Sequence, residues 1–367
     1  MSLRTHKLWL ASCYNPGIMQ FVHRAMGFWR RRSPRPRYAL ALAGGGVIGG
    51  MYEVGAMTAL EERLNGSGRG FDVYVGCSAG SVVAALLASG IRASEIYAIL
   101  DEDLDDPLNM RRGVLFADGA FRLACTRFGR FMWAIGKNIV RGGRCLPDVL
   151  ARAERELPAG FFTLAALERF IRLGLASRGH GNAFSDLPRP LLIPAVDLNT
   201  AERVVFGAGE LAGVPISDAV AASSAIPGFF DPYTINGRDY VDGGVGFSGH
   251  ADLAAEAGAD VVFVVNPLVP NRTLDGAGSM RLRGVYTIME QASRIYSQNL
   301  LQPPQNTELL FGPSMGFEAS RAALRFGYTS TKLWLDEQGA SLVRALNGPD
   351  GSALIAPKAR VAPTAPA

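Results

Sequence analysis

A serine between two glycines is the strongest candidate for a nucleophile in this chain. The run from Gly76 to Gly80, GCSAG, fits the pattern GxSxG with Ser78 at its centre. An apolar stretch at 71–77 predicts a strand before it, and an apolar stretch at 81–89 predicts a buried helix after it. In such a setting a sharp turn raises the serine hydroxyl out of the sheet, and the helix N-terminus favours developing negative charge. The pattern therefore predicts acyl-transfer chemistry at Ser78.

Three consecutive glycines lie upstream of that serine. Gly44, Gly45 and Gly46 follow an apolar stretch and precede a helical one. Because glycine has no side chain in the way, its backbone N–H at a helix N-terminus suits a phosphate or an oxyanion. With Gly49 the run also fits GxGxxG, the dinucleotide fingerprint, which requires an acidic residue at the end of the next strand. Asp72 opens that strand instead, so an oxyanion loop is favoured over a dinucleotide site.

The serine needs a base, and the chain offers two kinds. Asp242 ends a short predicted strand, and Gly243 and Gly244 after it let the carboxylate lie close to other backbone. The histidines are His6, His23, His180 and His250. His250 lies eight residues after Asp242, so a Ser-Asp-His order is formally available. An α/β-hydrolase-type esterase with a Ser78–Asp–His250 triad is therefore an alternative to a serine that is paired with Asp242.

These motifs, in this order, resemble those of the patatin-like phospholipase family. The glycine loop comes first, and the GxSxG serine follows 34 residues after Gly44. The stretch 222–230, ASSAIPGFF, is similar to the block ahead of the family's catalytic aspartate, and DGG at 242–244 is similar to the family's DG[GA] motif. The stretch 194–200, PAVDLNT, resembles a strand and turn of the family. The likeness spans 38–346.

The resemblance implies a mechanism and a fold. Ser78 would be the nucleophile and Asp242 its base, with no histidine between them. The oxyanion hole would be formed by Gly44, Gly45 and Gly46. The glycines that would support these motifs are Gly76, Gly80, Gly243 and Gly244. The expected substrates are acyl esters of phospholipids or lysophospholipids, with no cofactor and no metal. The expected fold is α/β with three layers, in which helices flank a mainly parallel central sheet.

The glycine loop departs from the family pattern in two positions. The family usually has Asp or Asn before the glycines and Arg or Lys two residues after them. Here Ala43 replaces the polar residue and Ile48 replaces the cation. The backbone donors of an oxyanion hole survive these changes. The missing cation nevertheless motivates a further alternative, a non-catalytic, membrane-binding regulatory module on a patatin-like scaffold.

The order of predicted elements agrees with an α/β fold. Short apolar runs predict strands at 38–43, 71–77, 190–198, 202–207 and 260–267, and another that ends at Val241. Helical patterns cover 50–64, 81–89, 216–226, 279–301 and 317–346. The region 93–187 predicts several helices, which could form either a lid or a scaffold. Alternation of strand and helix near the N-terminus indicates a parallel sheet.

Charge divides the chain into a basic arm and a mildly acidic body. The net charge is +4, but residues 1–52 carry eight basic residues and no acid. The remainder has 29 bases and 33 acids, or −4, so the nucleic-acid-binding class is disfavoured. A helix is predicted at 18–31, where Phe28 and Trp29 beside arginines suit an anionic membrane surface. The arm therefore predicts either peripheral membrane contact or a plain terminus, mobile or packed on the body as a helix.

Composition favours a folded protein of a reducing compartment. Apolar residues make up 48% and charged residues 19% of the 367, which excludes a disordered chain. Four scattered cysteines form no CxxC pair, so neither a disulfide framework nor a zinc site is indicated. No transmembrane span is predicted, and a cytoplasmic location follows. The expected domains are a basic arm at 1–37, an acyl hydrolase domain at 38–346 and a disordered Ala/Pro-rich tail at 347–367.

Overall fold

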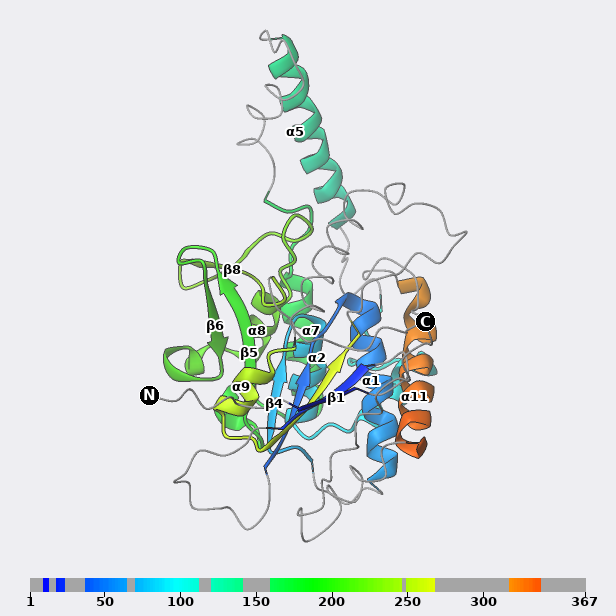
Figure 1. Cartoon of the computed structure of the whole chain (residues 1–367). Helices are drawn as coiled ribbons and strands as arrows, with labels where there is room; N and C mark the ends of the chain where they lie inside the picture. The colour runs from blue at the N-terminus through cyan, green and yellow to red at the C-terminus, as the bar shows by residue number, and fades with distance from the viewer. Residues whose placement is uncertain are drawn as a thin grey trace, which may run out of the picture.

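A twisted sheet runs through the body of the molecule in the computed structural model (Figure 1). The structure describes residues 9–12, 18–23, 37–64, 70–111, 120–140, 159–245, 249–267 and 317–337. Within these residues nine strands share one sheet in the order β1-β2-β9-β3-β4-β5-β8-β7, and β6 pairs with β5. The strands are β1 (Trp9–Ser12), β2 (Ile18–His23), β3 (Tyr38–Leu42), β4 (Val73–Gly76), β5 (Leu191–Asp197), β6 (Glu202–Phe206), β7 (Tyr233–Ile235), β8 (Arg238–Asp242) and β9 (Val261–Asn266).

Parallel pairing is confined to the centre of the sheet. Strands β9, β3, β4 and β5 run parallel to one another, and the strands on either side join them antiparallel. Every residue of β3, β4 and β9 is buried, as expected for strands that are covered on both faces. The prediction of an α/β fold with a central sheet is confirmed.

Helices cover both faces of the sheet. The described α-helices are α1 (Gly46–Arg63), α2 (Ala79–Ala88), α3 (Ala93–Asp101), α5 (Ala120–Val140), α7 (Ala165–Ser177), α8 (Ile216–Ser223), α9 (Ala251–Glu256) and α11 (Ser320–Glu337), of which α5 projects away from the sheet. On one face Leu40 and Phe263 share a core with α1, α2 and α8, and on the other Ala39 and Val262 pack with α9. Alternate residues of a strand point to opposite faces, so each central strand supplies both cores. Among the described helices, none is long and apolar enough to cross a bilayer.

The N-terminal segment contains a strand where a helix was predicted. Ile18–His23 forms β2, whose six residues pair with β9 from Ile18 opposite Asn266 to His23 opposite Val261. The helix prediction for 18–31 is therefore wrong over 18–23. β9 would otherwise present a row of unpaired backbone groups at a sheet edge, and a segment rich in Ile, Phe and Val can satisfy them. The remainder of the predicted arm helix and the predicted helix at 279–301 lie outside the described residues, as does the tail at 347–367.

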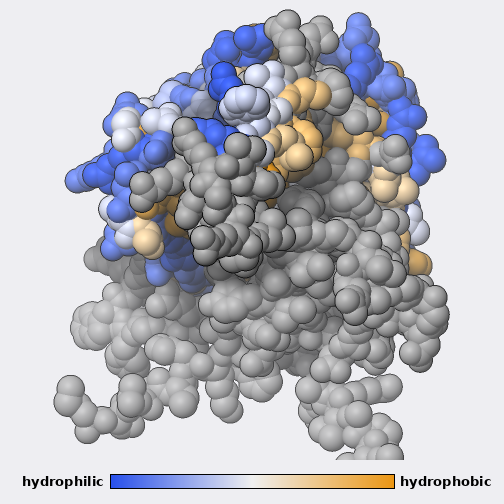
Figure 2. Space-filling model, turned by 90° about the horizontal axis from the view of Figure 1, so that it is seen from above, coloured by the Kyte–Doolittle hydropathy of each residue, from blue (hydrophilic) through white to orange (hydrophobic). Residues whose placement is uncertain are grey.

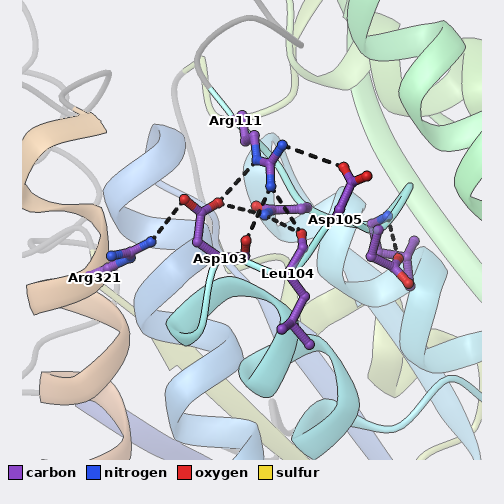
Figure 3. Close-up of polar contacts among 8 residues, drawn as sticks. Asp103, Leu104, Asp105, Arg111 and Arg321 are labelled. Atoms are coloured by element: carbon purple, nitrogen blue, oxygen red, sulfur yellow. Dashed lines mark hydrogen bonds and ion pairs between the residues drawn. The ribbon is translucent and has the colours of Figure 1, made fainter.

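The region that follows α3 is held to the body by ion pairs. Figure 3 shows Asp103 between Arg111 of its own loop, at 3.0 Å, and Arg321 of α11, at 3.2 Å. Arg325 of α11 adds a pair with Asp101 at 2.7 Å. The carboxylates in this acidic stretch thus bind arginines from two parts of the chain. The sequence predicts that 93–187 forms either a lid or a scaffold. The first part of that region, 93–111, belongs to the scaffold.

Helices α1 and α11 approach each other closely at two glycines. A Cβ atom on Gly55 would overlap the carbonyl oxygen of Leu324, and one on Gly327 would overlap the carbonyl oxygen of Tyr52. Beside this contact Tyr52 Oη lies 3.3 Å from Ser330 Oγ. Such crowding leaves no room for a methyl group unless one helix moves.

We therefore expect Gly55→Ala and Gly327→Ala to lower the free energy of unfolding by about 1–3 kcal/mol, because the added methyl groups overpack the helix interface. Urea denaturation measures the effect. Gly136→Ala in α5 is the matched control, since a Cβ there meets no atom within 4 Å and alanine favours a helix. Equal stability of all three variants would contradict the packing argument.

Candidate active site

Ser78 occupies a strained turn between strand and helix. β4 ends at Gly76 and α2 begins at Ala79, and Ser78 between them has φ 53° and ψ −130°. A positive φ in a residue other than glycine costs on the order of 1–3 kcal/mol and persists only where the surroundings enforce it. The turn is enforced by hydrogen bonds: Gly80 N donates to Cys77 O at 2.8 Å, and Ser78 N donates to Ser223 Oγ at 3.0 Å.

The glycines of GxSxG are required by close backbone approach. A Cβ on Gly76 would lie 2.6 Å from the carbonyl oxygen of Gly80, and one on Gly80 would lie 2.5 Å from that of Leu42. Both distances are shorter than real Cβ contacts allow. The turn can therefore pack against the end of β3 only with glycine at both positions.

Asp242 accepts a hydrogen bond directly from the hydroxyl group of Ser78. Ser78 Oγ donates to Asp242 Oδ2 at 2.6 Å, and Gly244 N donates to Asp242 Oδ1 at 2.7 Å. The two side chains are 164 positions apart in the chain, and both are buried, with 7% and 6% exposed. Burial raises the pKa of Asp242 from 3.8 to about 6, while the hydrogen bonds from Ser78 and Gly244 act in the opposite direction. The result is a carboxylate of increased basicity against a serine hydroxyl.

A short segment at the end of α8 forms hydrogen bonds with both Asp242 and the turn that carries Ser78. Asp242 N donates to Ala225 O at 3.0 Å, and Ser223 Oγ, which accepts from Ser78 N, donates to Pro194 O at 2.6 Å. Ser223 thereby links the nucleophile turn to β5. Ser223 lies in the stretch 222–230 that resembles a family block, but this link could not be predicted from the sequence. A serine in an alanine-rich helix carries no local pattern that indicates such a contact. A Cβ on Gly243 would overlap the carbonyl oxygen of Pro194, so glycine is needed there too.

The glycine loop lies against the serine turn. Gly44, Gly45 and Gly46 have φ of 78°, 114° and 65°, a run that residues with side chains rarely adopt. A Cβ on Gly44 would also lie 3.1 Å from Ala79 N. Helix α1 begins at Gly46, four residues before the predicted start, so the loop itself forms the helix N-terminus. The loop therefore packs, through Gly44, on the backbone of the turn that carries Ser78.

Of the backbone amides of Gly44, Gly45 and Gly46, one donates a hydrogen bond to a side chain of the protein. Gly44 N donates to Glu53 Oε1 at 2.7 Å, whereas the amides of Gly45 and Gly46 have no acceptor among the described residues. Glu53 is fully buried, and its Oε2 has no hydrogen-bond partner there either. Burial raises the pKa of Glu53 well above its usual value, because a charged carboxylate is costly where it is removed from water. No motif in the sequence assigns Glu53 a role, and only the structure shows its contact with Gly44.

His250 lies near the site but is bonded elsewhere. Arg203 Nη1 lies 3.3 Å from Nδ1 of the ring, and Nε2 lies 3.1 Å from Gly243 O. Because arginine can only donate, Nδ1 accepts, and Nε2 carries the proton toward Gly243 O. Burial lowers the pKa of His250 to about 4, so the ring is neutral. Its hydrogen bonds support the turn after Asp242 and do not link Asp242 to Ser78.

Solved structures of other proteins align with this chain at low sequence identity and low TM-score. VipD from Legionella pneumophila aligns at 14% identity and a TM-score of 0.35, over 92% of this chain and 71% of its own. ExoU of Pseudomonas aeruginosa, in complex with SpcU, aligns at 17% identity and a TM-score of 0.33, over 92% of this chain and 60% of its own.

The chain also matches curated relatives and one family model. Uncharacterized NTE family proteins of Mycobacterium bovis and Mycobacterium tuberculosis are 30% identical over 217 residues, 59% of this chain. The match spans 44% of the length of those relatives. The family model described as patatin-like phospholipase matches residues 40–254, a stretch that includes Ser78 and Asp242. That match covers more than half of the chain, and the chain therefore belongs to the patatin-like phospholipase family.

Proposed function

We propose that this protein is a serine acyl hydrolase that cleaves phospholipid or lysophospholipid esters, with Ser78 as nucleophile and Asp242 as general base. The observation that supports it most directly is the 2.6 Å hydrogen bond from Ser78 Oγ to Asp242 Oδ2 in a strained strand–helix turn. Membership of a lipid hydrolase family supplies the substrate class. The His250 triad is disfavoured, because the serine proton already faces a carboxylate and the ring nitrogens face other groups.

The first step is attack on the ester carbonyl. Ser78 Oγ forms a bond to the carbonyl carbon while its proton passes to Asp242 Oδ2. An ordinary aspartate, with a pKa of about 3.9, is a weak base for an alcohol. A pKa of about 6 makes Asp242 a stronger base while it remains ionised at neutral pH. The carbonyl oxygen becomes the oxyanion of a tetrahedral intermediate.

We assign the stabilisation of that oxyanion to the amides of Gly45 and Gly46. The Gly44 amide is already bonded to Glu53, so Gly44 contributes the loop conformation and not a donor. Removal of one oxyanion donor typically costs on the order of 10²–10³ in rate. Neither amide depends on a side chain at position 48, so the replacement of the family cation by Ile48 leaves both donors in place. A catalytic protein is therefore favoured over a non-catalytic scaffold.

The second half of the reaction restores the enzyme. As the intermediate collapses, the bond to the leaving alcohol breaks and Asp242 returns its proton to that oxygen, which leaves an acyl-serine. A water molecule then attacks the acyl carbonyl while Asp242 accepts its proton. Collapse of the second intermediate breaks the bond to Ser78, which takes back the proton, and a fatty acid leaves.

Labelling with a fluorophosphonate probe tests the proposal. The wild type should be labelled and should release fatty acid from mixed phospholipid vesicles, and Ser78→Ala should do neither, because the probe and the ester need the same nucleophile. Circular dichroism of both proteins controls for folding. A folded wild type that is never labelled would indicate the non-catalytic alternative instead.

Paired variants separate the two bases. Asp242→Asn should lower kcat/KM on a soluble ester by about 10²–10⁴, because the amide cannot accept the serine proton. It should not lower stability at neutral pH, since it removes a buried charge. His250→Gln is the matched control and should keep the rate within about tenfold. The reverse order of effects would support the His250 triad.

The pH dependence of kcat/KM reports the ionisation of the base. Since Asp242 must be ionised and its pKa is raised to about 6, activity should fall as the pH drops through 6 and level off above it. His250, with a pKa of about 4, is neutral throughout that range. A half-maximal rate near pH 4, the ordinary aspartate value of about 3.9, would show that the base is not a buried carboxylate.

A further inference from the structure

Helix α5 extends away from the sheet and carries charge of one sign only. In Figure 1 it projects from one end of the molecule, well separated from the helices that cover the sheet. Its 21 residues include Arg122, Arg127, Arg130 and Lys137 but no acidic residue. The body after residue 52 has 29 bases and 33 acids in all, so this helix is a local exception to the charge of the body.

The two faces of α5 differ in exposure. Arg127, Phe131 and Ile135 are spaced four residues apart, so they lie on one face, and all three are partly buried. Another face exposes large apolar side chains: 53% of Phe128, 50% of Met132 and 76% of Trp133. These large apolar residues lie within two helical turns.

No described part of the protein covers that apolar face. A Cβ added at Gly129 or Gly136, which lie on it, would meet no atom within 4 Å. Arg130, three residues before Trp133, is exposed beside it. Figure 2 views this end of the molecule and shows orange apolar side chains directly beside blue hydrophilic ones. Exposed Trp and Phe next to arginine, on a helix with no acidic residue of its own, are typical of helices that lie in the interface of an anionic bilayer.

The buried face of α5 is anchored to the segment that holds the base. Arg127 Nη1 donates to Gly160 O at 2.5 Å, and its Nη2 donates to Asp231 Oδ2 at 2.7 Å. Asp231 follows Phe229 and Phe230, and the same segment begins at the residues that hydrogen-bond the backbone of Asp242. Arg127 thus connects α5 to the segment that hydrogen-bonds the backbone of Asp242.

We propose that the exposed face of α5, formed by Phe128, Met132, Trp133 and Arg130, docks the protein on an anionic lipid bilayer. Charge complementarity and aromatic exposure select this occupant over a second copy of the chain, because two copies of a face that carries only positive charge would repel each other. The benefit to catalysis rests on the proposed function, since a docked α5 would hold the site next to lipid esters. The docking itself does not depend on catalysis.

Sedimentation with vesicles tests the docking in the Ser78→Ala protein, which removes turnover from the measurement. Vesicles of phosphatidylcholine alone are compared with vesicles that also contain phosphatidylglycerol. We expect Trp133→Glu to weaken binding to the anionic vesicles by about tenfold or more. Arg130→Gln should weaken it by roughly fivefold, the usual contribution of one cation at such a surface. Added salt should weaken it further.

Leu333→Glu is the matched control, because Leu333 on α11 is 49% exposed and lies on a different helix. It should leave vesicle binding unchanged. With Ser78 restored, Trp133→Glu should hydrolyse a soluble ester at the wild-type rate but vesicle lipid more slowly. Equal binding by Trp133→Glu and the parent protein would overturn the proposal, as would a dimer in ultracentrifugation that Trp133→Glu converts to a monomer.

Failure of the proposed function gives a different pattern. In that case the protein with Ser78 intact hydrolyses neither the soluble ester nor vesicle lipid, while the vesicle binding of the Ser78→Ala protein still depends on Trp133. If only the docking proposal fails, the soluble ester is hydrolysed at the normal rate and vesicle binding does not respond to Trp133→Glu. The two measurements therefore decide the two proposals separately.

Discussion

The buried hydrogen bond between Ser78 and Asp242 is the contact on which the rest of the site depends. Its two residues come from different strands, β4 and β8, with β5 lying between them in the sheet. Because β8 runs antiparallel to β5, its last residue, Asp242, pairs with Ala195 in the middle of β5. That pairing brings the carboxylate back toward the turn after β4. A 2.6 Å contact across an intervening strand then requires close backbone approach, which Gly243 permits beside Pro194.

Two buried carboxyl groups beside the serine turn serve different purposes. Burial raises the pKa of both Asp242 and Glu53. Asp242 keeps two hydrogen bonds that favour its charged form, and with a pKa of about 6 it is ionised at neutral pH. Glu53 has one oxygen without a partner among the described residues, and burial shifts its pKa well above the usual value. The first group can therefore accept a proton, while the second holds the amide of Gly44 and shapes the glycine loop.

The segment from Ser223 to Asp231 connects the chemistry to the surface. At its start Ser223 and Ala225 hydrogen-bond the turn of Ser78 and the strand of Asp242. At its end Asp231 binds Arg127 of α5. The apolar side chains of Phe229 and Phe230 contact each other edge to face between these two anchors, with ring centroids 4.8 Å apart. A single short stretch thus positions the base and supports the helix whose exposed face we assign to the bilayer.

The sequence alone determined the parts of this protein that local backbone geometry controls. Three patterns were sufficient to predict the family and the α/β class: GxSxG between an apolar strand and an apolar helix, three adjacent glycines, and Asp-Gly-Gly. The same patterns single out Ser78 and Asp242, which hydrogen-bond each other in the structure. Tertiary structure alone decided that 18–23 is a strand, that Gly44 is bonded to Glu53, and that His250 faces Arg203 and Gly243. It also decided which face of α5 stays exposed. These features depend on contacts between residues far apart in the chain, such as the 145 positions between Ser78 and Ser223. No local pattern encodes such contacts, because they exist only after the layers have packed.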